Sequence, residues 1–240
     1  MTQFILVHGA CHGAWCWRDV IPALEARGHG ARAIDLPGRG GGVEGLTLAD
    51  QAEAILSAYE GTAVLVGHSA GGFAISAAAE RAPERVTRLI YVAALVPQDG
   101  DVLGRVMQGL TGPRADLPLV VAEDRLSYSF DLTGAGPVLY NGATQEVMDW
   151  ALPQITFEPS APHREAIRLG DAFARAAKSY VLCNADRMIP EEDQRRMARD
   201  MRDIAEIDTG HSPFLSEPER LAADLVRLAG RAEKPVTAGS

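Results

Sequence analysis

The feature that most constrains the fold is an apolar run that leads straight into a Gly-x-Ser-x-Gly motif. Residues 62–67 read Thr-Ala-Val-Leu-Val-Gly, and His68 and Ser69 follow. An alanine-rich segment then runs from Ala70 to Ala82. A short apolar run is typical of a buried strand, and a longer segment of this composition is typical of a helix. The pattern predicts a strand, a sharp turn and a helix, with Ser69 on the turn.

The glycines around Ser69 make such a turn feasible. A serine at the tip of a strand-to-helix turn has a strained backbone, and side chains at Gly67 and Gly71 would collide with the turn. Ser69 is therefore the predicted nucleophile. The N–H of the next residue, Ala70, is a predicted donor to the negative oxygen that develops during attack.

A serine nucleophile of this kind works with an acid and then a histidine that follow it in the chain. Of the six histidines, only His211 comes late enough to follow such an acid. It lies in a loop after the apolar run 204–207, where it can reach the crevice at the carboxyl ends of parallel strands. His211 is therefore the predicted general base.

Asp186 is the predicted acid, because it follows the apolar run 180–183 at the carboxyl end of a strand. A carboxylate there can accept the Nδ1–H of His211, which leaves Nε2 free to take the serine proton. Asp99 and Asp101, just beyond the preceding strand, are rival candidates.

The loop after the first apolar run supplies a second oxyanion donor. Residues 4–7 are Phe-Ile-Leu-Val, and Ala10 follows in the next loop. Stabilising an oxyanion takes two backbone N–H groups, one beside the nucleophile and one from this loop. The N–H of Ala10 is the expected second donor.

These motifs resemble the plant methylesterase and hydroxynitrile lyase branch of the α/β-hydrolase superfamily. The similarity spans residues 4–228 and is least in the middle; it is carried by the segments 8–17, 67–72, 180–194 and 211–218. The resemblance implies an α/β-hydrolase fold, a catalytic triad and an oxyanion hole. It places the triad at Ser69, Asp186 and His211, and the oxyanion hole at Ala10 and Ala70.

Two positions favour an esterase over a lyase within this branch. The lyases carry threonine after the first-strand histidine and lysine after the catalytic histidine, whereas this chain has Gly9 and Ser212. The lysine would stabilise departing cyanide, and Ser212 cannot. We expect a serine carboxylic-ester hydrolase that forms an acyl-enzyme on a small to medium, largely apolar ester. A hydroxynitrile lyase-like or C–C bond-cleaving enzyme, or a ligand-binding receptor with a slow triad, stays open.

The chain outside these motifs alternates apolar runs with amphipathic segments. This alternation predicts a mostly parallel sheet of about six strands with helices on both faces. The strand candidates are 3–7, 31–35, 62–67, 88–93, 179–183 and 203–207. The helix candidates are 15–27, 48–59, 70–81, 191–201 and 217–229.

Residues 97–178 break the alternation with prolines and short helical stretches such as 145–151 and 163–177. An insertion at this point between core strands is where α/β-hydrolases carry a cap, so the resemblance implies a helical cap over the site. The predicted organisation is thus a core of 1–96 and 179–230, a cap of 97–178 and a disordered tail of 231–240. The expected substrate-binding side chains are Phe73, Phe214, Trp150 and Tyr128.

Composition excludes several classes of partner, and the motifs above leave a small-molecule ester as the expected one. A formal net charge of −9 without a basic patch argues against nucleic acid. His8, His12, Cys11 and Cys16 lie close together, but no further ligands complete a zinc spacing, so neither a metal nor another cofactor is expected. No apolar segment predicts a membrane span or a signal peptide, and three cysteines give no disulfide framework, so we expect the cytoplasm. The oligomeric state stays open, a homodimer included.

Overall fold

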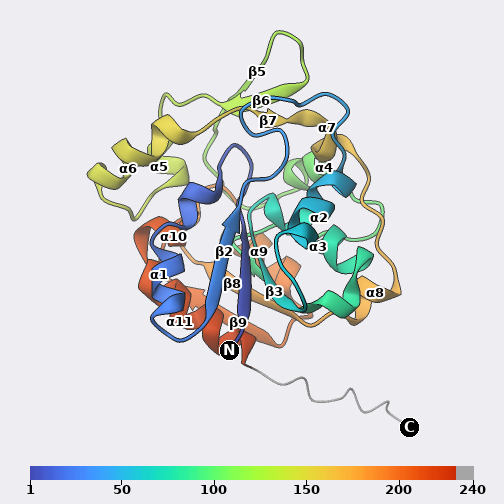
Figure 1. Cartoon of the computed structure of the whole chain (residues 1–240). Coiled ribbons are helices and arrows are strands. Elements are labelled where there is room, and N and C mark those ends of the chain that lie inside the picture. Colours follow the sequence, from blue (N-terminus) through green and yellow to red (C-terminus); the bar gives the residue numbers. More distant parts are fainter. Residues whose placement is uncertain (231–240) are drawn as a thin grey trace.

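A six-stranded parallel sheet forms the centre of the molecule (Figure 1). The computed structural model describes residues 1–230, and the predicted tail of 231–240 lies outside the described residues. The strands are β1 (Gln3–Val7), β2 (Gly30–Ile34), β3 (Ala63–His68), β4 (Val86–Val92), β8 (Lys178–Cys183) and β9 (Asp203–Ile207). Their order is β2-β1-β3-β4-β8-β9, and every neighbouring pair is parallel. The predicted α/β-hydrolase fold is confirmed.

The central strands of this sheet are buried on both faces, which is why β1 and β3 read as apolar runs. Successive side chains of a strand point to opposite faces. In β1, Phe4 and Leu6 belong to one hydrophobic cluster, whereas Ile5 and Val7 belong to the other. All six residues of β3 are buried, so the strand that leads to Ser69 lies in the middle of the core.

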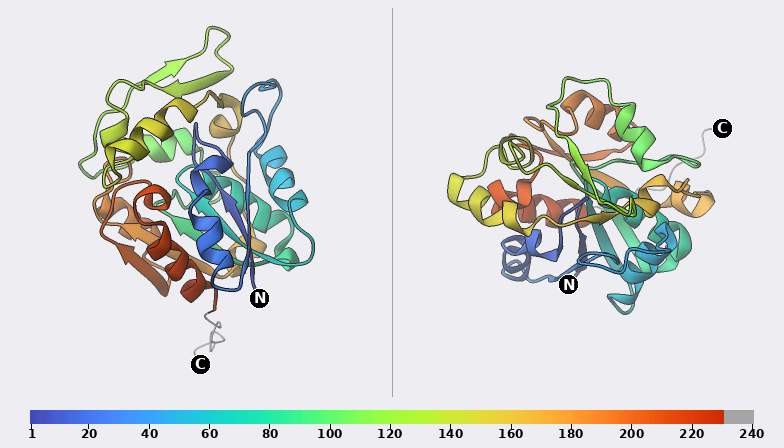
Figure 2. Two further views of the ribbon diagram at one scale, coloured as in Figure 1. Left: turned by 60° about the vertical axis from the view of Figure 1, so that its left-hand side comes forward. Right: turned by 90° about the horizontal axis from the view of Figure 1, so that it is seen from above.

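Helices cover each face of the sheet (Figure 2). Side chains of α1 and α11 pack in the cluster of Phe4 and Leu6, and side chains of α2 and α3 pack in the cluster of Ile5 and Val7. The core helices are η1 (Ala14–Trp17), α1 (Val20–Glu25), α2 (Leu48–Ser57), α3 (Gly71–Arg81), η2 (Pro83–Arg85), α9 (Glu191–Ala198), α10 (Pro213–Ser216) and α11 (Pro218–Ala229).

One predicted helix is divided in the structure. The segment 15–27 forms the 3-10 turn η1 and then α1, which begins only at Val20. Pro22 has no N–H to bond the carbonyl of Arg18, so it fits in the first turn of α1 but not in the interior of a helix that begins at residue 15.

Most of the segment between β4 and β8 lies over the carboxyl ends of the core strands, whereas α8 lies lower, beside α3 (Figure 1). Figure 2 shows the same segment from two further sides. Its helices are α4 (Leu103–Gln108), α5 (Gly136–Leu139), α6 (Gln145–Ala151), η3 (Leu152–Gln154), α7 (Ser160–Arg164) and α8 (Asp171–Arg175). Its strands are β5 (Leu119–Val121), β6 (Ser127–Phe130) and β7 (Glu158–Pro159). We call residues 97–178 the cap.

The cap differs from the predicted helical insertion in two ways. β5, β6 and β7 form a three-stranded antiparallel sheet that the sequence did not predict. The expected helix 163–177 is broken between Arg164 and Asp171, where Ala166 instead pairs with Val102 in an isolated bridge. The stretch 145–151, in contrast, is helical as expected.

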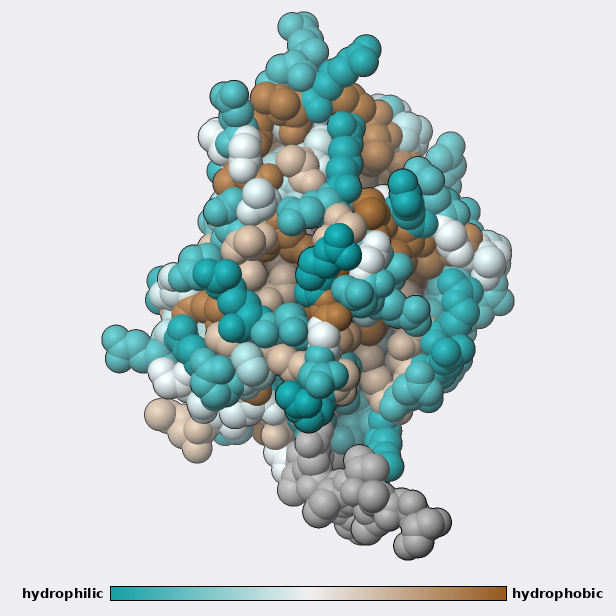
Figure 3. All heavy atoms as spheres, turned by 90° about the vertical axis from the view of Figure 1, so that its right-hand side faces the viewer, coloured by the Kyte–Doolittle hydropathy of each residue, from teal (hydrophilic) through white to brown (hydrophobic). Residues whose placement is uncertain are grey.

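Hydrophobic side chains reach the surface mainly on the cap. Figure 3 shows them gathered toward the top of the molecule. Among the described residues, the exposed large hydrophobic side chains other than Met1 are Leu119, Val120, Val121, Leu126, Leu132 and Phe157. No helix within residues 1–230 is both long and apolar enough to cross a membrane.

Candidate active site

Ser69 occupies the strained turn that its motif predicts. It follows β3 directly and has a φ of 51°, a left-handed conformation that costs a non-glycine residue energy. The end of β4 holds the turn, because Ser69 N donates to Val92 O at 3.3 Å and Leu95 N donates to Ser69 O at 3.1 Å. The serine side chain is thereby presented at the carboxyl ends of the central strands.

His211 and Asp186 meet beside this turn. Nδ1 of His211 lies 2.8 Å from Oδ2 of Asp186, and both side chains are buried. The carboxylate is an acceptor, so Nδ1 carries the hydrogen and Nε2 is left as the basic nitrogen. The structure therefore brings together the predicted base and the predicted acid.

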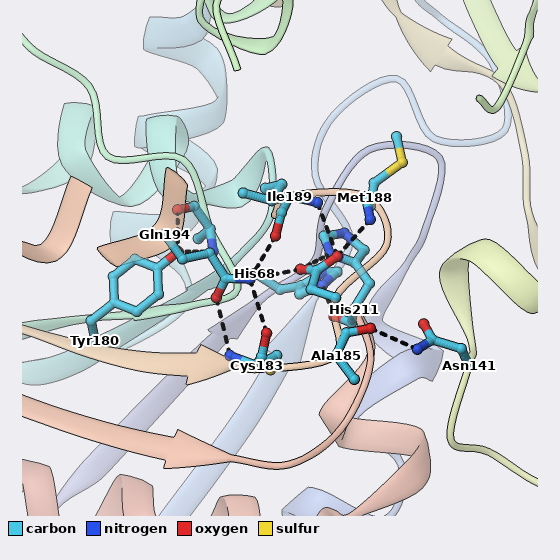
Figure 4. A network of polar contacts seen from close by, with 11 residues as sticks. His68, Asn141, Tyr180, Cys183, Ala185, Met188, Ile189, Gln194 and His211 are labelled. Atoms are coloured by element: carbon cyan, nitrogen blue, oxygen red, sulfur yellow. Dashed lines mark hydrogen bonds and ion pairs between the residues drawn. The ribbon is translucent and has the colours of Figure 1, made fainter. Parts of the chain in front are cut away.

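Three further donors hold the Asp186 carboxylate in place. Oδ1 accepts the N–H groups of Met188 at 2.7 Å and Ile189 at 2.9 Å, and Oδ2 accepts Nε2 of Gln194 at 3.0 Å. Figure 4 shows Gln194, Met188, Ile189 and His211 converging on this point. These donors fix the orientation of the buried carboxylate toward His211.

The rival acids have other partners. Oδ1 of Asp99 accepts the N–H of Leu169 at 2.9 Å, and Oδ2 of Asp101 accepts the N–H of Gln98 at 2.8 Å. Asp101 thus caps a local turn and Asp99 joins the two ends of the cap, whereas His211 contacts Asp186.

Two backbone N–H groups beside Ser69 have no acceptor among residues 1–230, namely those of Ala10 and Ala70. The loop that carries Ala10 lies against the nucleophile, since a Cβ built on Gly9 would be 2.8 Å from Cβ of Ser69. Unpaired backbone donors near the protein interior are rare. Both unpaired N–H groups thus belong to segments that adjoin the serine.

The Ser69 hydroxyl makes no hydrogen bond within the described chain, and the residue is partly exposed. Apo enzymes often show long or absent catalytic hydrogen bonds, which form only when substrate is bound. The hydroxyl is thus free to be approached by Nε2 of His211 and by a ligand.

A group of neutral histidines surrounds the site. Nε2 of His68 donates to the carbonyl of His211 at 2.9 Å, and the two rings lie 4.6 Å apart. Burial, together with His211 and His12 nearby, lowers the pKa of His68 well below its usual value. Burial also lowers the pKa of His8 to about 4 and that of His12 to about 3. These rings therefore fix loops by hydrogen bonds and packing and add no positive charge.

The four side chains expected to bind substrate lie in different surroundings. Phe214 is wholly buried, with its ring edge-on to His68 at 4.7 Å, and Phe73 is buried against Ala70. The ring centroids of Trp150 and Trp15 lie 5.4 Å apart, and the guanidinium of Arg18 lies over the ring of Trp150.

Tyr128 is the fourth of these side chains, and its hydroxyl pairs with Nδ1 of His163 at 2.6 Å. Phe73 and Phe214 thus support the turn and the histidines from within the core. Trp150 and Tyr128 belong to the cap, and their role in binding stays a prediction.

Sequence reasoning did not include Gln194 or His68 among the site residues. Gln194 holds the acid, and His68 holds the backbone of the base. The sequence offers a signal for each. Gln194 lies in a segment that is otherwise strongly charged, and His68 lies inside the serine motif. Within residues 1–230 no group of three or more His, Cys, Asp and Glu side chains is arranged to hold a metal ion.

Comparison with known proteins supports the same assignment of family. Residues 4–224 match the model of the alpha/beta hydrolase family. Methylesterase 7 of Arabidopsis thaliana is 30% identical to the chain over 251 residues, which cover 95% of the chain and 96% of that protein. Esterase PIR7B of Oryza sativa subsp. japonica is 30% identical over 262 residues, with 96% and 97% covered.

A solved structure also superposes over most of the chain. It is a pyrethroid hydrolase from Sphingobium faniae JZ-2, with a TM-score of 0.80 and 25% identity, and the match covers 95% of this chain and 97% of that one. The resemblance to plant methylesterases that the motifs predicted is confirmed.

Proposed function

This chain belongs to the alpha/beta hydrolase family, and on that basis we propose that it is a serine carboxylic-ester hydrolase with Ser69, His211 and Asp186 as its triad. Its relatives include proteins named methylesterase and esterase, which supports an ester-bond hydrolase. The observation that carries the proposal is the position of Ser69. It lies on a strained turn beside a buried His211–Asp186 pair and two unpaired backbone N–H groups.

In the proposed mechanism, Nε2 of His211 takes the Ser69 proton while Oγ attacks the ester carbonyl. Asp186 holds His211 in the tautomer that leaves Nε2 basic, and it stabilises the imidazolium that forms. The N–H groups of Ala10 and Ala70 stabilise the negative oxygen of the tetrahedral intermediate. The imidazolium then protonates the departing alcohol, which leaves an acyl group on Ser69.

Water completes the cycle. His211 removes a proton from a water molecule that attacks the acyl carbonyl, and the proton returns to Oγ of Ser69 as the carboxylic acid leaves. Each step is a proton or acyl transfer, so the proposed reaction requires no oxidant, reductant or cofactor.

The side chains next to the oxyanion donors favour an apolar acyl group. Ala70 lies in a hydrophobic cluster to which the cap contributes Leu103 and Ile167, and Ala10 packs against the same cluster. We propose small to medium, uncharged esters, with methyl and aryl esters first, which agrees with the name of Methylesterase 7.

Ester hydrolysis is favoured over cyanohydrin cleavage by the space around Gly9. A Cβ at this position would lie 2.8 Å from both Nδ1 of His68 and Cβ of Ser69, so the threonine typical of the lyases does not fit without a shift. Ser212 follows His211 and supplies no charge for a departing cyanide.

The compartment is a second part of the proposal. All three cysteines are buried and free, as in proteins that work in a reducing environment. We therefore keep the cytoplasm as the proposed location and a small-molecule ester as the proposed partner.

Covalent labelling tests the nucleophile directly. The intact mass of the wild type after treatment with a fluorophosphonate should increase by one adduct, located on Ser69, and p-nitrophenyl butyrate should be hydrolysed. Ser69→Ala should abolish both, whereas Ser57→Ala, at an exposed serine on α2, should change neither. Labelling of another residue, or faster release of cyanide from mandelonitrile than of p-nitrophenol from p-nitrophenyl acetate, would overturn the proposal.

A further inference from the structure

The loop that carries Ala10 is held in place by the cap. Cys11, the next residue, has a φ of 64°, which is unfavourable for a side chain with a Cβ. Both of its backbone groups are bound by the cap: its N–H donates to Oε2 of Glu158 at 3.2 Å, and its carbonyl accepts the N–H of Thr156 at 3.0 Å. An unfavourable backbone conformation persists only where its surroundings impose it.

Further contacts tie the same loop to the cap. Nε2 of His12 pairs with the hydroxyl of Tyr140 at 3.0 Å. The guanidinium of Arg39 donates to the carbonyl of His12 at 3.1 Å and to that of Gln154 at 3.2 Å. The loop after β1 therefore depends on a seated cap for its conformation.

Glu158 is the only carboxylate among these contacts, and burying a carboxylate costs free energy. The residue is 3% exposed, and the Cys11 N–H is its hydrogen-bond donor. Its other oxygen lies 3.6 Å from Nε2 of His163, whose Nδ1 pairs with the hydroxyl of Tyr128. A buried carboxylate with so few donors is weak evidence for a role in stability.

We propose that Glu158 is a positioning residue of the active site. Its carboxylate binds the Cys11 N–H and so holds the preceding residue, Ala10, with its N–H toward the oxyanion. This inference rests on the proposed function, because it assumes that Ala10 is an oxyanion donor. It makes the formation of the oxyanion hole conditional on the seating of the cap.

The charge state of Glu158 should modulate this effect. Burial raises its pKa to about 7, and the Cys11 N–H and Arg39 partly offset that rise. The other titratable groups that face it are His163, whose pKa burial lowers to about 4, and Tyr128 and the Cys11 thiol, whose pKa values burial raises. All three are neutral near pH 7, so Glu158 is the group that changes charge there. An ionised carboxylate is the stronger acceptor for the Cys11 N–H.

Replacement of Glu158 tests the inference. Glu158→Ala should lower kcat about 10- to 100-fold, less than or comparable to the loss of one oxyanion donor, with KM changed less than about threefold. The affinity for a trifluoromethyl ketone, which forms a tetrahedral oxyanion on the serine, should fall by the same factor as kcat. The affinity for the matching methyl ketone should stay nearly constant, which a general loosening of the site would not produce.

Two variants serve as controls. Glu158→Gln keeps an oxygen acceptor, so it should restore kcat to within about fivefold of the wild type and remove an ionisation near pH 7 from the profile of kcat. Glu165→Ala removes another cap carboxylate that accepts a core N–H, that of Leu48 at 2.9 Å, and should leave kcat unchanged.

The outcomes separate this inference from the proposed function. If Ser69 is labelled by the fluorophosphonate but Glu158→Ala keeps the wild-type kcat and ketone affinity, the positioning role is wrong. If Glu158→Ala fails to fold, the pH profiles of Glu158→Gln and the wild type decide, and identical profiles overturn the inference. If Ser69→Ala retains activity, the proposed function itself fails.

Discussion

At the scale of residues, the proposed chemistry depends on the buried hydrogen bond of 2.8 Å between Nδ1 of His211 and Oδ2 of Asp186. Ser69→Ala and His211→Ala should each lower kcat about 10³-fold or more, and the double variant should be little worse than either, because the two groups act in one step. Steady-state kinetics with p-nitrophenyl butyrate measure this. Additive losses would contradict a shared step.

Asp186→Asn should lower kcat about 10⁴-fold with the fold intact. An amide in place of the carboxylate would present an N–H donor to Nδ1 and stabilise the wrong tautomer of His211. Asp99→Asn, at an exposed acid on the same side of the sheet, is the matched control and should stay near wild-type activity. The reverse result would make Asp99 the acid of the triad.

Residues with a local signature could be predicted from the sequence, and residues defined by distant contacts could not. Ser69 lies in a motif, and His211 and Asp186 follow strand ends in the order that the resemblance implies. Glu158 has no local signature, because its partner Cys11 is far away in the chain and its strand has only two residues.

At the scale of elements, the start of α3 is packed too closely for any side chain. A Cβ on Gly72 would lie 2.1 Å from the carbonyl oxygen of Leu95, beyond the end of β4. Gly72→Ala should therefore displace α3, lower the free energy of unfolding by about 1–3 kcal/mol and slow labelling of Ser69. Urea unfolding and fluorophosphonate labelling rates measure the two effects.

Gly104→Ala is the control for this change. Gly104 also lies in a helix, α4, but a Cβ there meets only the carbonyl of His163 at an ordinary 3.7 Å. This variant should be at least as stable as the wild type, because alanine is the better helix former. Equal destabilisation by both variants would show that close packing at Gly72 is not the cause.

Prediction of elements succeeded where burial is continuous and failed where pairing is distant. The predicted strand 3–7 coincides with β1, since a strand buried on both faces reads as an apolar run. The predicted strand 203–207 coincides with β9, although this edge strand exposes Glu206. β5 is fully exposed and β7 has two residues, so neither carries an alternating pattern, and both exist through their pairing with β6.

At the scale of the whole molecule, buried histidines make the protein sensitive to acid. Burial lowers the pKa values of His8 and His163 to about 4 and of His12 to about 3, and it lowers that of His68 well below its ordinary value. Between pH 6.5 and 4 the unfolded chain binds more protons at these sites, so stability present above pH 6.5 is lost as pH falls. Each site contributes up to about 1.4 kcal/mol per pH unit.

Glu158 acts with the opposite sign in this range. Its pKa is raised to about 7, so its contribution to stability is present below the unfolded value and is lost as pH rises toward 7. The histidines outnumber it, and the free energy of unfolding in urea should fall steadily from pH 6.5 to 4.5. Glu158→Gln should be more stable than the wild type at pH 8 and should fall more steeply on acidification. A flat stability between pH 7 and 5 would contradict the neutral histidines.

The insertion of the cap between two neighbouring strands has a consequence for how such a protein can change over evolution. β4 and β8 are parallel neighbours, so the chain leaves the core at the carboxyl end of β4 and returns past α8 to the amino end of β8. The whole insertion could therefore be exchanged without altering the order of the sheet. A transplanted cap would bring new specificity only if it also supplied acceptors and donors for Cys11. Grafted caps that lack these groups should fold and still be poor catalysts. Exchange of caps in evolution should therefore be limited to caps that bind the backbone of Cys11.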